Sequence, residues 1–290
     1  MSTFKELIAE ACADEGITYE EFSLGYVLRM SKGGITRHAF GQKMDINPAG
    51  ADLIAGDKVA CYSIMKECGV PAIEHKLFFN SRIRASWLDE SGSWQPILDY
   101  FEANNRQVVV KLNQGSQGRS VFLCRSLVEL EKAVQSIFVS VPDVALCPFY
   151  EFDAEYRVFC VKGKAMFAYA KVAPGLGSGL GTKPENTATE GWKHNLSQGA
   201  FAMEITDAGL YGDLCDLAER AARCIGINFC TVDIAPINME FKPHLAVMEI
   251  NSGVSSQKLL EQMPYRRGFV KGIYAAALRE MFASPEPHLA

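Results

Sequence analysis

Two strand-like segments near the C-terminus carry acidic side chains in an otherwise apolar hairpin. Residues 229–237 and 245–251 are rich in apolar and β-branched residues, and a seven-residue connection that contains a proline joins them. In an antiparallel pair, residues equidistant from the loop centre oppose each other. With Phe241 at the centre, Asp233 is expected opposite Glu249.

The faces of this hairpin follow from strand alternation. The same count places Ile237 opposite Leu245. Side chains alternate along a strand, so Asn251 shares the face of Glu249, whereas Met248 and Ile250 point to the other face. Two carboxylates and an amide oxygen are therefore expected together on one face.

This arrangement predicts a divalent-cation site formed by Asp233, Glu249 and Asn251. Two carboxylates so close repel each other in a low dielectric unless a cation lies between them. Oxygen ligands without Cys or His favour Mg²⁺, or Mn²⁺, over zinc. The alternative is a solvated strand face on which Asn251 caps a strand end, but such a face would more usually alternate with Lys or Arg.

The composition excludes several classes of protein. The 290 residues are 48% hydrophobic and 22% charged, with a net charge of -5, which is typical of a globular protein. An acidic excess disfavours nucleic acid and anionic membranes as partners, and no apolar run is long enough to span a bilayer. The nine cysteines show no zinc spacing, and the charged N-terminus is unlike a signal peptide. We therefore expect buried thiols and a cytoplasmic protein, and a homodimer is compatible with the sequence.

Periodicity and capping residues predict an α+β fold. Asp57 is an N-cap for one helix and Gly226 ends another. Helices are expected at 1–15, 58–68, 94–103, 126–138, 207–224 and 267–283. Strands are expected within 24–46, on either side of a glycine turn, and at 73–79, 108–112, 119–124, 155–161 and 164–171, besides the hairpin. The expected divisions are 1–55, 56–146 and 147–290.

A glycine-rich turn at 114–118 separates two of these strands, so it is neither a Walker A motif nor a dinucleotide fingerprint. Its backbone N–H groups can close over phosphate oxygens, and Lys111 ends the strand that leads into it. An ordinary turn is the competing interpretation. Lys58 lies in the first turn of a helix, where a cation opposes the macrodipole, so either an anion compensates it or the side chain is simply solvated.

Three charged residues fall on adjacent strands. Arg157 alternates with Glu155 on one strand and Lys171 closes the next, for which a cross-strand ion pair is the simplest interpretation. The segment 175–181 is interpreted as a flexible glycine loop. The five histidines form no sequence cluster, and none is assigned as a catalytic base.

Taken in order, these segments resemble the ATP-grasp superfamily over residues 45–283. The segments that carry the resemblance are 55–58 with 69–71, 108–118, 147–150, 154–159, 192–195, 232–234 and 248–251. They resemble, in turn, the lysine-bearing helix, the second lysine with its phosphate loop, the adenine hinge, the ribose strand, a basic segment near the transferred phosphate, and the two metal strands.

The resemblance implies two α+β subdomains that grip ATP: a lid at 56–146 and a catalytic subdomain at 147–290, with a reduced N-terminal region. It implies that Asp233, Glu249 and Asn251 hold magnesium, and that Arg157 and Lys193 are catalytic. The implied ATP-binding residues are Lys58, Lys111, Gly115, Ser116, Gly118, Phe149, Tyr150, Glu155 and Asn195.

The function implied is that of a carboxylate–amine ligase that forms an acylphosphate from ATP and then an amide, with an amino acid or peptide as acceptor. The chain most resembles the ribosomal-protein-modifying glutamate ligases and the ligase half of cyanophycin synthetase. Thr231 stands where D-alanine:D-alanine ligases carry an arginine, and 252–257 departs from the usual segment after the metal asparagine. The alternatives are a small-molecule kinase and a non-catalytic nucleotide-binding module.

Overall fold

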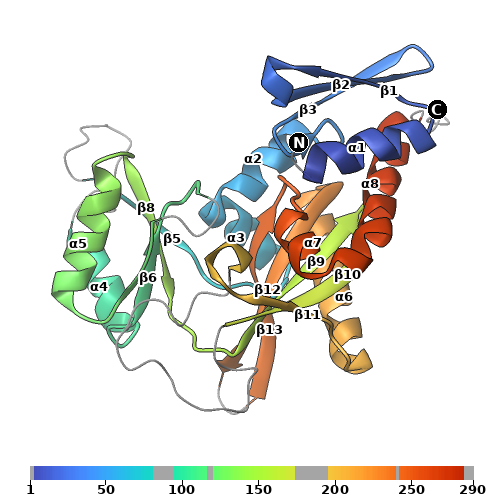
Figure 1. Ribbon diagram of the computed structural model, residues 1–290. Helices are drawn as coiled ribbons and strands as arrows, with labels where there is room; N and C mark the ends of the chain where they lie inside the picture. The colour runs from blue at the N-terminus through green and yellow to red at the C-terminus, as the bar shows by residue number, and fades with distance from the viewer. Residues whose placement is uncertain (1–2, 81–93, 116–119, 174–194, 240–241, 284–290) are drawn as a thin grey trace, which may run out of the picture.

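Antiparallel sheets organise the chain. The computed structural model describes residues 3–80, 94–115, 120–173, 195–239 and 242–283, and within them the strands form three sheets. In Figure 1 the sheet formed within residues 76–148, which we call the lid sheet, lies on the left, the C-terminal sheet lies in the centre, and the N-terminal sheet lies at the upper right. The predicted α+β architecture is confirmed.

The N-terminal region forms a helix and a small sheet. Its elements are α1 (Thr3–Asp14), β1 (Thr18–Phe22), β2 (Val27–Lys32), β3 (Ile35–Phe40) and β4 (Lys43–Met44), and the sheet has the order β1-β2-β3-β4. The sequence predicted the helix and the two central strands but not β1 or β4. It also missed α2 (Ala49–Gly56), which directly precedes α3 (Lys58–Glu67).

The lid sheet has the order β5-β8-β6-β7, with two helices on one face. Its elements are β5 (Lys76–Phe79), α4 (Gln95–Ala103), β6 (Val108–Lys111), β7 (Val121–Cys124), α5 (Leu127–Phe138) and β8 (Asp143–Pro148). Ser126 caps α5 by accepting a hydrogen bond from the Glu129 backbone N–H, which satisfies an otherwise unpaired donor. All of these elements were predicted except β8.

The C-terminal sheet has the order β11-β10-β9-β12-β13. Its strands are β9 (Ala154–Val161), β10 (Lys164–Val172), β11 (Phe201–Met203), β12 (Phe229–Met239) and β13 (Lys242–Asn251), and the helices are α6 (Ala208–Ile225), α7 (Gln257–Gln262) and α8 (Arg267–Phe282). Gly226, at a φ of 73°, ends α6 in the left-handed conformation that glycine adopts without strain. Among the described helices, none has the length and apolar character that crossing a membrane requires.

The hairpin of β12 and β13 confirms one predicted pair and corrects another. Asp233 lies opposite Glu249, but Ile237 lies opposite His244 rather than Leu245. The strands extend closer to the turn than predicted. A bulge between Asp233 and Ile234 adds one residue to β13 and so shifts the pairing on the turn side by one residue.

The bulge also changes the face of one side chain. Met248 packs against the apolar residues of the carboxylate face, whereas Ile250 packs with α6 on the opposite face. The prediction that both point away from the carboxylates is therefore wrong for Met248. A regular two-residue alternation does not hold across the extra residue.

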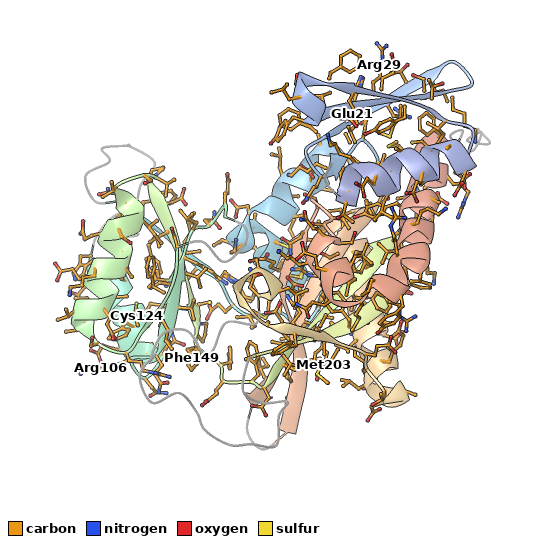
Figure 2. All side chains as sticks on the ribbon, viewed as in Figure 1. Glu21, Arg29, Arg106, Cys124, Phe149 and Met203 are labelled. Atoms are coloured by element: carbon orange, nitrogen blue, oxygen red, sulfur yellow. The ribbon has the colours of Figure 1, made fainter. Side chains whose placement is uncertain are left out.

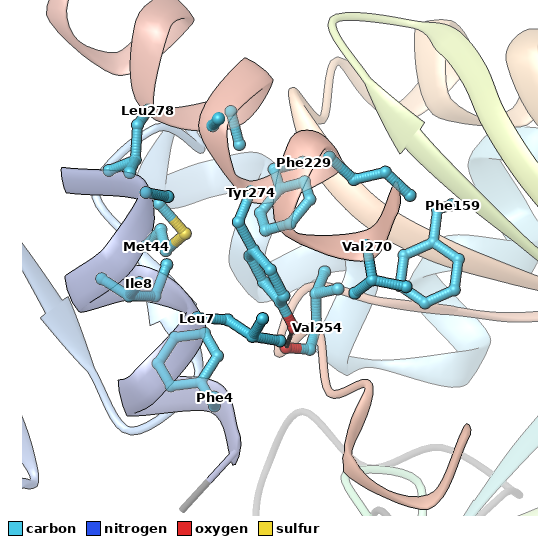
Figure 3. Close-up of a cluster of buried hydrophobic side chains, with 14 of the residues drawn as sticks. Phe4, Leu7, Ile8, Met44, Phe159, Phe229, Val254, Val270, Tyr274 and Leu278 are labelled. Atoms are coloured by element: carbon cyan, nitrogen blue, oxygen red, sulfur yellow. Dashed lines mark hydrogen bonds between the residues drawn. The ribbon is translucent and has the colours of Figure 1, made fainter. Parts of the chain in front are cut away.

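The N-terminal region belongs to the core of the C-terminal sheet. Leu7 and Ile8 of α1 are fully buried with Phe229 and with Tyr274 of α8 (Figure 3). The Tyr274 ring makes edge contacts with Phe4 and Phe229, at centroid distances of 5.6 and 5.8 Å. The face of the sheet opposite α6 is thus completed by the first helix of the chain.

Leu7→Ala should therefore destabilise the whole protein by about 2–5 kcal/mol, because it leaves a cavity in this shared core. The matched control is Leu24→Ala, which removes the same atoms from a fully exposed side chain and should change little. Urea unfolding followed by circular dichroism measures both. Equal stability of the two variants would show that α1 does not contribute to the core.

Candidate functional site

A row of directly opposed residues crosses four strands of the C-terminal sheet. Register places Tyr169 of β10 opposite Arg157 of β9, Arg157 opposite Asp233 of β12, and Asp233 opposite Glu249 of β13. Opposed side chains lie within about 5.5 Å at Cβ. Glu155 and Lys171 were also predicted to pair across strands. They oppose each other on β9 and β10, two residues away from the pair of Arg157 and Tyr169.

Asp233 is the centre of a buried charge network. Arg157 donates to both of its oxygens, from Nε and from a terminal nitrogen, each at 2.6 Å, and the Lys171 ammonium lies 3.2 Å from Oδ1. Asp233 is only 4% exposed, and burial by itself would raise its pKa. The positive charges of Arg157 and Lys171 outweigh that effect and lower the pKa of Asp233 to about 2.

Glu155 is the second acid of this network. Lys171 donates to Oε1 of Glu155 and therefore bridges two carboxylates. Burial raises the pKa of Glu155 to about 7, and the nearby Asp233 charge adds to the rise that Lys171 opposes. The confirmed cross-strand ion pair thus joins β9 and β10 directly beneath Asp233.

Protein cations neutralise the opposed carboxylates, which corrects the sequence-based argument that a metal must do so. Arg157 and Lys171 compensate Asp233, and the Lys58 ammonium lies 3.7 Å from Oε2 of Glu249. Asn251 also donates from Nδ2 to Asp233, at 3.3 Å. The repulsion between Asp233 and Glu249 therefore does not by itself require a bound metal ion.

Lys58 lies near Glu249 because α3 packs beside β13 and the loop after β6 holds the start of α3. Asn113 accepts from the Val59 backbone N–H at 3.2 Å and donates to Asp57 at 2.7 Å, while Asp57 caps the helix. Asn113 is 3% exposed, so these bonds are shielded from water. Sequence reasoning missed this residue, although its place two residues after Lys111 was a usable signal.

The Lys58 side chain is used within the protein as well as facing Glu249. Its ammonium donates to the carbonyl of Gly115 at 2.8 Å and lies 3.4 Å from that of Asn113. Burial lowers the pKa of Lys58, and Glu249 offsets part of that change. Gly115 is needed here, since a Cβ on it would meet Leu112 Cβ at 2.8 Å.

Lys111 differs from Lys58 in that no acidic side chain of the described residues pairs with it. It is 9% exposed, and no described side chain or carbonyl accepts a hydrogen bond from its ammonium. A lysine that is largely buried and not neutralised by a described side chain is suited to a bound anion.

An apolar group, which we call the junction cluster, spans the lid sheet and the C-terminal sheet. Its buried members are Ile73, Val109, Cys147, Ala235, Ile237 and Ala246. Phe149 and Tyr150, predicted at the hinge, pack against this cluster where the chain leaves the lid; Phe149 is labelled in Figure 2. Its backbone N–H donates to the Gln107 carbonyl at 3.1 Å.

Other predicted site residues are not joined to this centre. Asn195 caps a short 3₁₀ turn, Leu196–Gln198, by accepting from Ser197, and within the described chain no hydrogen bond links it to the acids. Ser116, Gly118 and Lys193 lie outside the described residues. The same is true of the glycine loop at 175–181.

The three predicted metal ligands suit a hard cation by their chemistry. They offer carboxylate and amide oxygens, and Glu249 engages only Lys58, at 3.7 Å, among the described side chains. The Asp233 oxygens already accept bonds from Arg157, Lys171 and Asn251, so an ion would have to share them. No group of three or more His, Cys, Asp or Glu side chains in the described part of the chain is arranged to hold a metal.

Comparison with known proteins gives a likeness in fold. No protein-family model matches the chain, and no curated protein matches it significantly in sequence. Among solved structures, the D-cycloserine synthetase DcsG is 20% identical with a TM-score of 0.57, over 81% of this chain and 73% of that one. The Bacillus anthracis D-alanine–D-alanine ligase complexed with ATP is 16% identical with a TM-score of 0.53, over 81% and 67%.

A third similar structure extends over the N-terminal region. The bifunctional glutathione synthetase of Pasteurella multocida is 14% identical with a TM-score of 0.55, over 94% of this chain and 43% of that one. The ATP-grasp ligase PsnB also matches. The protein has the ATP-grasp fold, as the resemblance of its motifs predicted.

The charge network predicts a pH-dependent effect of Asp233→Asn. At pH 7 the variant should lose about 3–5 kcal/mol of stability, because Arg157 and Lys171 lose their buried partner. The folded-state pKa of Asp233 is depressed, so its contribution is present above about 3.8 and is lost as the pH falls through about 2. The gap between wild type and variant should therefore stay constant from pH 7 to about pH 4 and shrink between about pH 4 and pH 2.

Urea unfolding at a series of pH values measures this gap. Asp213→Asn, at an exposed position on α6, is the matched control and should show a negligible difference at every pH. A gap for Asp233→Asn that is constant down to pH 2 would contradict the assignment of an ionised, cation-paired Asp233.

Proposed function

We propose that the protein is an ATP-dependent carboxylate–amine ligase that releases ADP and phosphate. The observation that carries the proposal is that Lys58, at the start of α3, lies near an acid of the C-terminal sheet and close to a second lysine, Lys111 of the lid sheet. The Lys58 ammonium lies 3.7 Å from Oε2 of Glu249, and Lys111 is 9% exposed and has no anion partner among the described residues. ATP carries the phosphates that such lysines bind and that acid-held metal ions bridge.

The phosphate end of the site is assigned as follows. Lys111 and Lys58 bind phosphate oxygens of ATP, and the backbone at Gly115 approaches them. Asp233, Glu249 and Asn251 would hold magnesium, which when bound neutralises charge on the terminal phosphates. Arg157 orients Asp233 through its two hydrogen bonds, and with Lys193 it stabilises negative charge in the transition state.

The chemistry proceeds in two transfers. A carboxylate oxygen of the first substrate attacks the γ-phosphorus, and the bond from that phosphorus to ADP breaks. The amine nitrogen of an amino acid or peptide then attacks the acyl carbon, phosphate leaves, and the amine loses its proton. The protein forms no covalent bond; it supplies position and charge.

Hydroxylamine should trap the acylphosphate. With ATP, magnesium and the correct carboxylate, the wild-type protein should yield a hydroxamate and ADP even without the amine, because hydroxylamine is a strong nucleophile. Screening amino acids and short peptides by ADP release identifies the carboxylate, and mass spectrometry measures the hydroxamate. Chelating the magnesium should abolish both products.

The products also separate the alternatives. A phosphorylated hydroxyl compound in place of hydroxamate would establish a kinase. Formation of AMP and pyrophosphate would contradict the acylphosphate mechanism. Nucleotide binding without turnover of any substrate would favour a non-catalytic module.

Lys111→Ala should weaken ATP binding more than Lys58→Ala does. Lys58 already binds the Gly115 carbonyl and Glu249, whereas the Lys111 charge is free to interact with phosphate. Calorimetric titration with a non-hydrolysable ATP analogue measures the difference. Lys66→Ala, at an exposed position on the same helix as Lys58, is the control and should bind like wild type. Equal losses, or the reverse order, would contradict this assignment.

A further inference from the structure

His75 carries a buried ring nitrogen without a partner. The residue is 4% exposed, and its Nε2 has no hydrogen-bond partner among the described residues. A buried polar atom of this kind destabilises the fold unless a ligand satisfies it.

The one hydrogen bond of the ring determines its protonation. Nδ1 lies 2.9 Å from the Ile73 carbonyl oxygen, which can only accept, so Nδ1 carries the proton. Burial, together with the positive charges of Lys111 and Lys58, lowers the pKa of His75 well below its ordinary range and disfavours a second proton. Nε2 is therefore an acceptor and needs a donor.

The place of His75 next to Lys76 shows that its side chain lies on the face of the lid sheet that also carries Lys111. Lys76, the next residue, extends over the rings of Phe78 and Tyr100 on the helix side, at 5.6 and 5.7 Å. Because successive side chains in extended chain point to opposite faces, His75 lies on the face away from the helices. The electrostatic effect of Lys111 on His75 agrees with this placement.

The same face bears the junction cluster. Ile73, two residues before His75, belongs to it, and so does Val109, two residues before Lys111 on β6. This face of the lid sheet therefore combines buried apolar side chains of the kind that pack against a flat ring, a lysine suited to phosphate, and one acceptor nitrogen without a hydrogen-bond partner among the described residues. A phosphate offers no donor to that nitrogen, whereas the exocyclic amino group of adenine does.

We infer that His75 Nε2 accepts a hydrogen bond from the 6-amino group of the nucleotide base and so selects adenine over guanine. Guanine presents an acceptor oxygen at that position, which would face the His75 lone pair. A site built around a hydrogen-bonding group discriminates strongly because a mismatched ligand leaves the buried atom unpaired. The inference rests on the nucleotide binding of the proposed function.

Calorimetry with ADP and with the diphosphate of purine riboside, which lacks the 6-amino group, tests it. Wild type should bind ADP about 10-fold more tightly than the analogue, the effect of one hydrogen bond whose loss leaves a buried acceptor. His75→Leu should bind the two equally, with the loss falling on ADP. His75→Gln, whose amide oxygen can accept, should keep part of the preference.

His38→Phe, on the exposed N-terminal sheet, is the control and should keep the wild-type ratio. Thermal unfolding establishes that each variant is folded. If His75→Leu does not fold, the wild-type ratio decides, and a ratio of one overturns the inference. The same variants are compared with 3′-deoxy-ADP. If wild type prefers ADP over 3′-deoxy-ADP and only His75→Leu loses this preference, Nε2 binds the ribose hydroxyl, and the inference about the 6-amino group is overturned.

The outcomes separate the two proposals. If wild type binds no nucleotide, the proposed function fails. If wild type binds ADP but His75→Leu keeps the full preference for the 6-amino group, the role of His75 alone is wrong.

Discussion

The bidentate bond between Arg157 and Asp233 is the interaction around which the functional face is built. Either charge alone would destabilise the fold, because an unpaired ion at this depth leaves its desolvation cost uncompensated. Lys171 and Glu155 extend the pair into a network of two cations and two acids over β9, β10 and β12. Those strands must therefore keep their register, and this in turn places Glu249 on the adjoining β13.

A second set of polar bonds couples the lid sheet to α3. Asn113 binds Asp57 and the backbone of Val59, so Lys58 and Lys111 are presented together although they are 53 positions apart in the sequence. Lys58, which an acid of the protein neutralises, and Lys111, which no described acid neutralises, have different roles. The first ties the lid to the acid row, and the second remains for a ligand.

Local sequence signals predicted much of the fold for identifiable reasons. The cap at Asp57, the glycine after α6 and the apolar period of α5 and α8 act within one element, so they can be recognised without tertiary information. Strands β1, β4, β8 and β11 and helices α2 and α7 were missed. β4 has two residues, and β1 is largely exposed, so neither shows a clear apolar alternation. β8 becomes recognisable only when its pairing with β5 and β6 is known.

The sequence by itself determined the facing pair Asp233 and Glu249 and the cross-strand pair Glu155 and Lys171, because both depend on strand alternation and nearby turns. Only the tertiary structure decided which charges neutralise which. Arg157 and Lys58 reach their acids from segments distant in the chain, and no local pattern encodes that proximity. The bulge in β12–β13 and the unpaired nitrogen of His75 were likewise hidden, since a register shift and a missing partner are properties of packed neighbours, not of residue order.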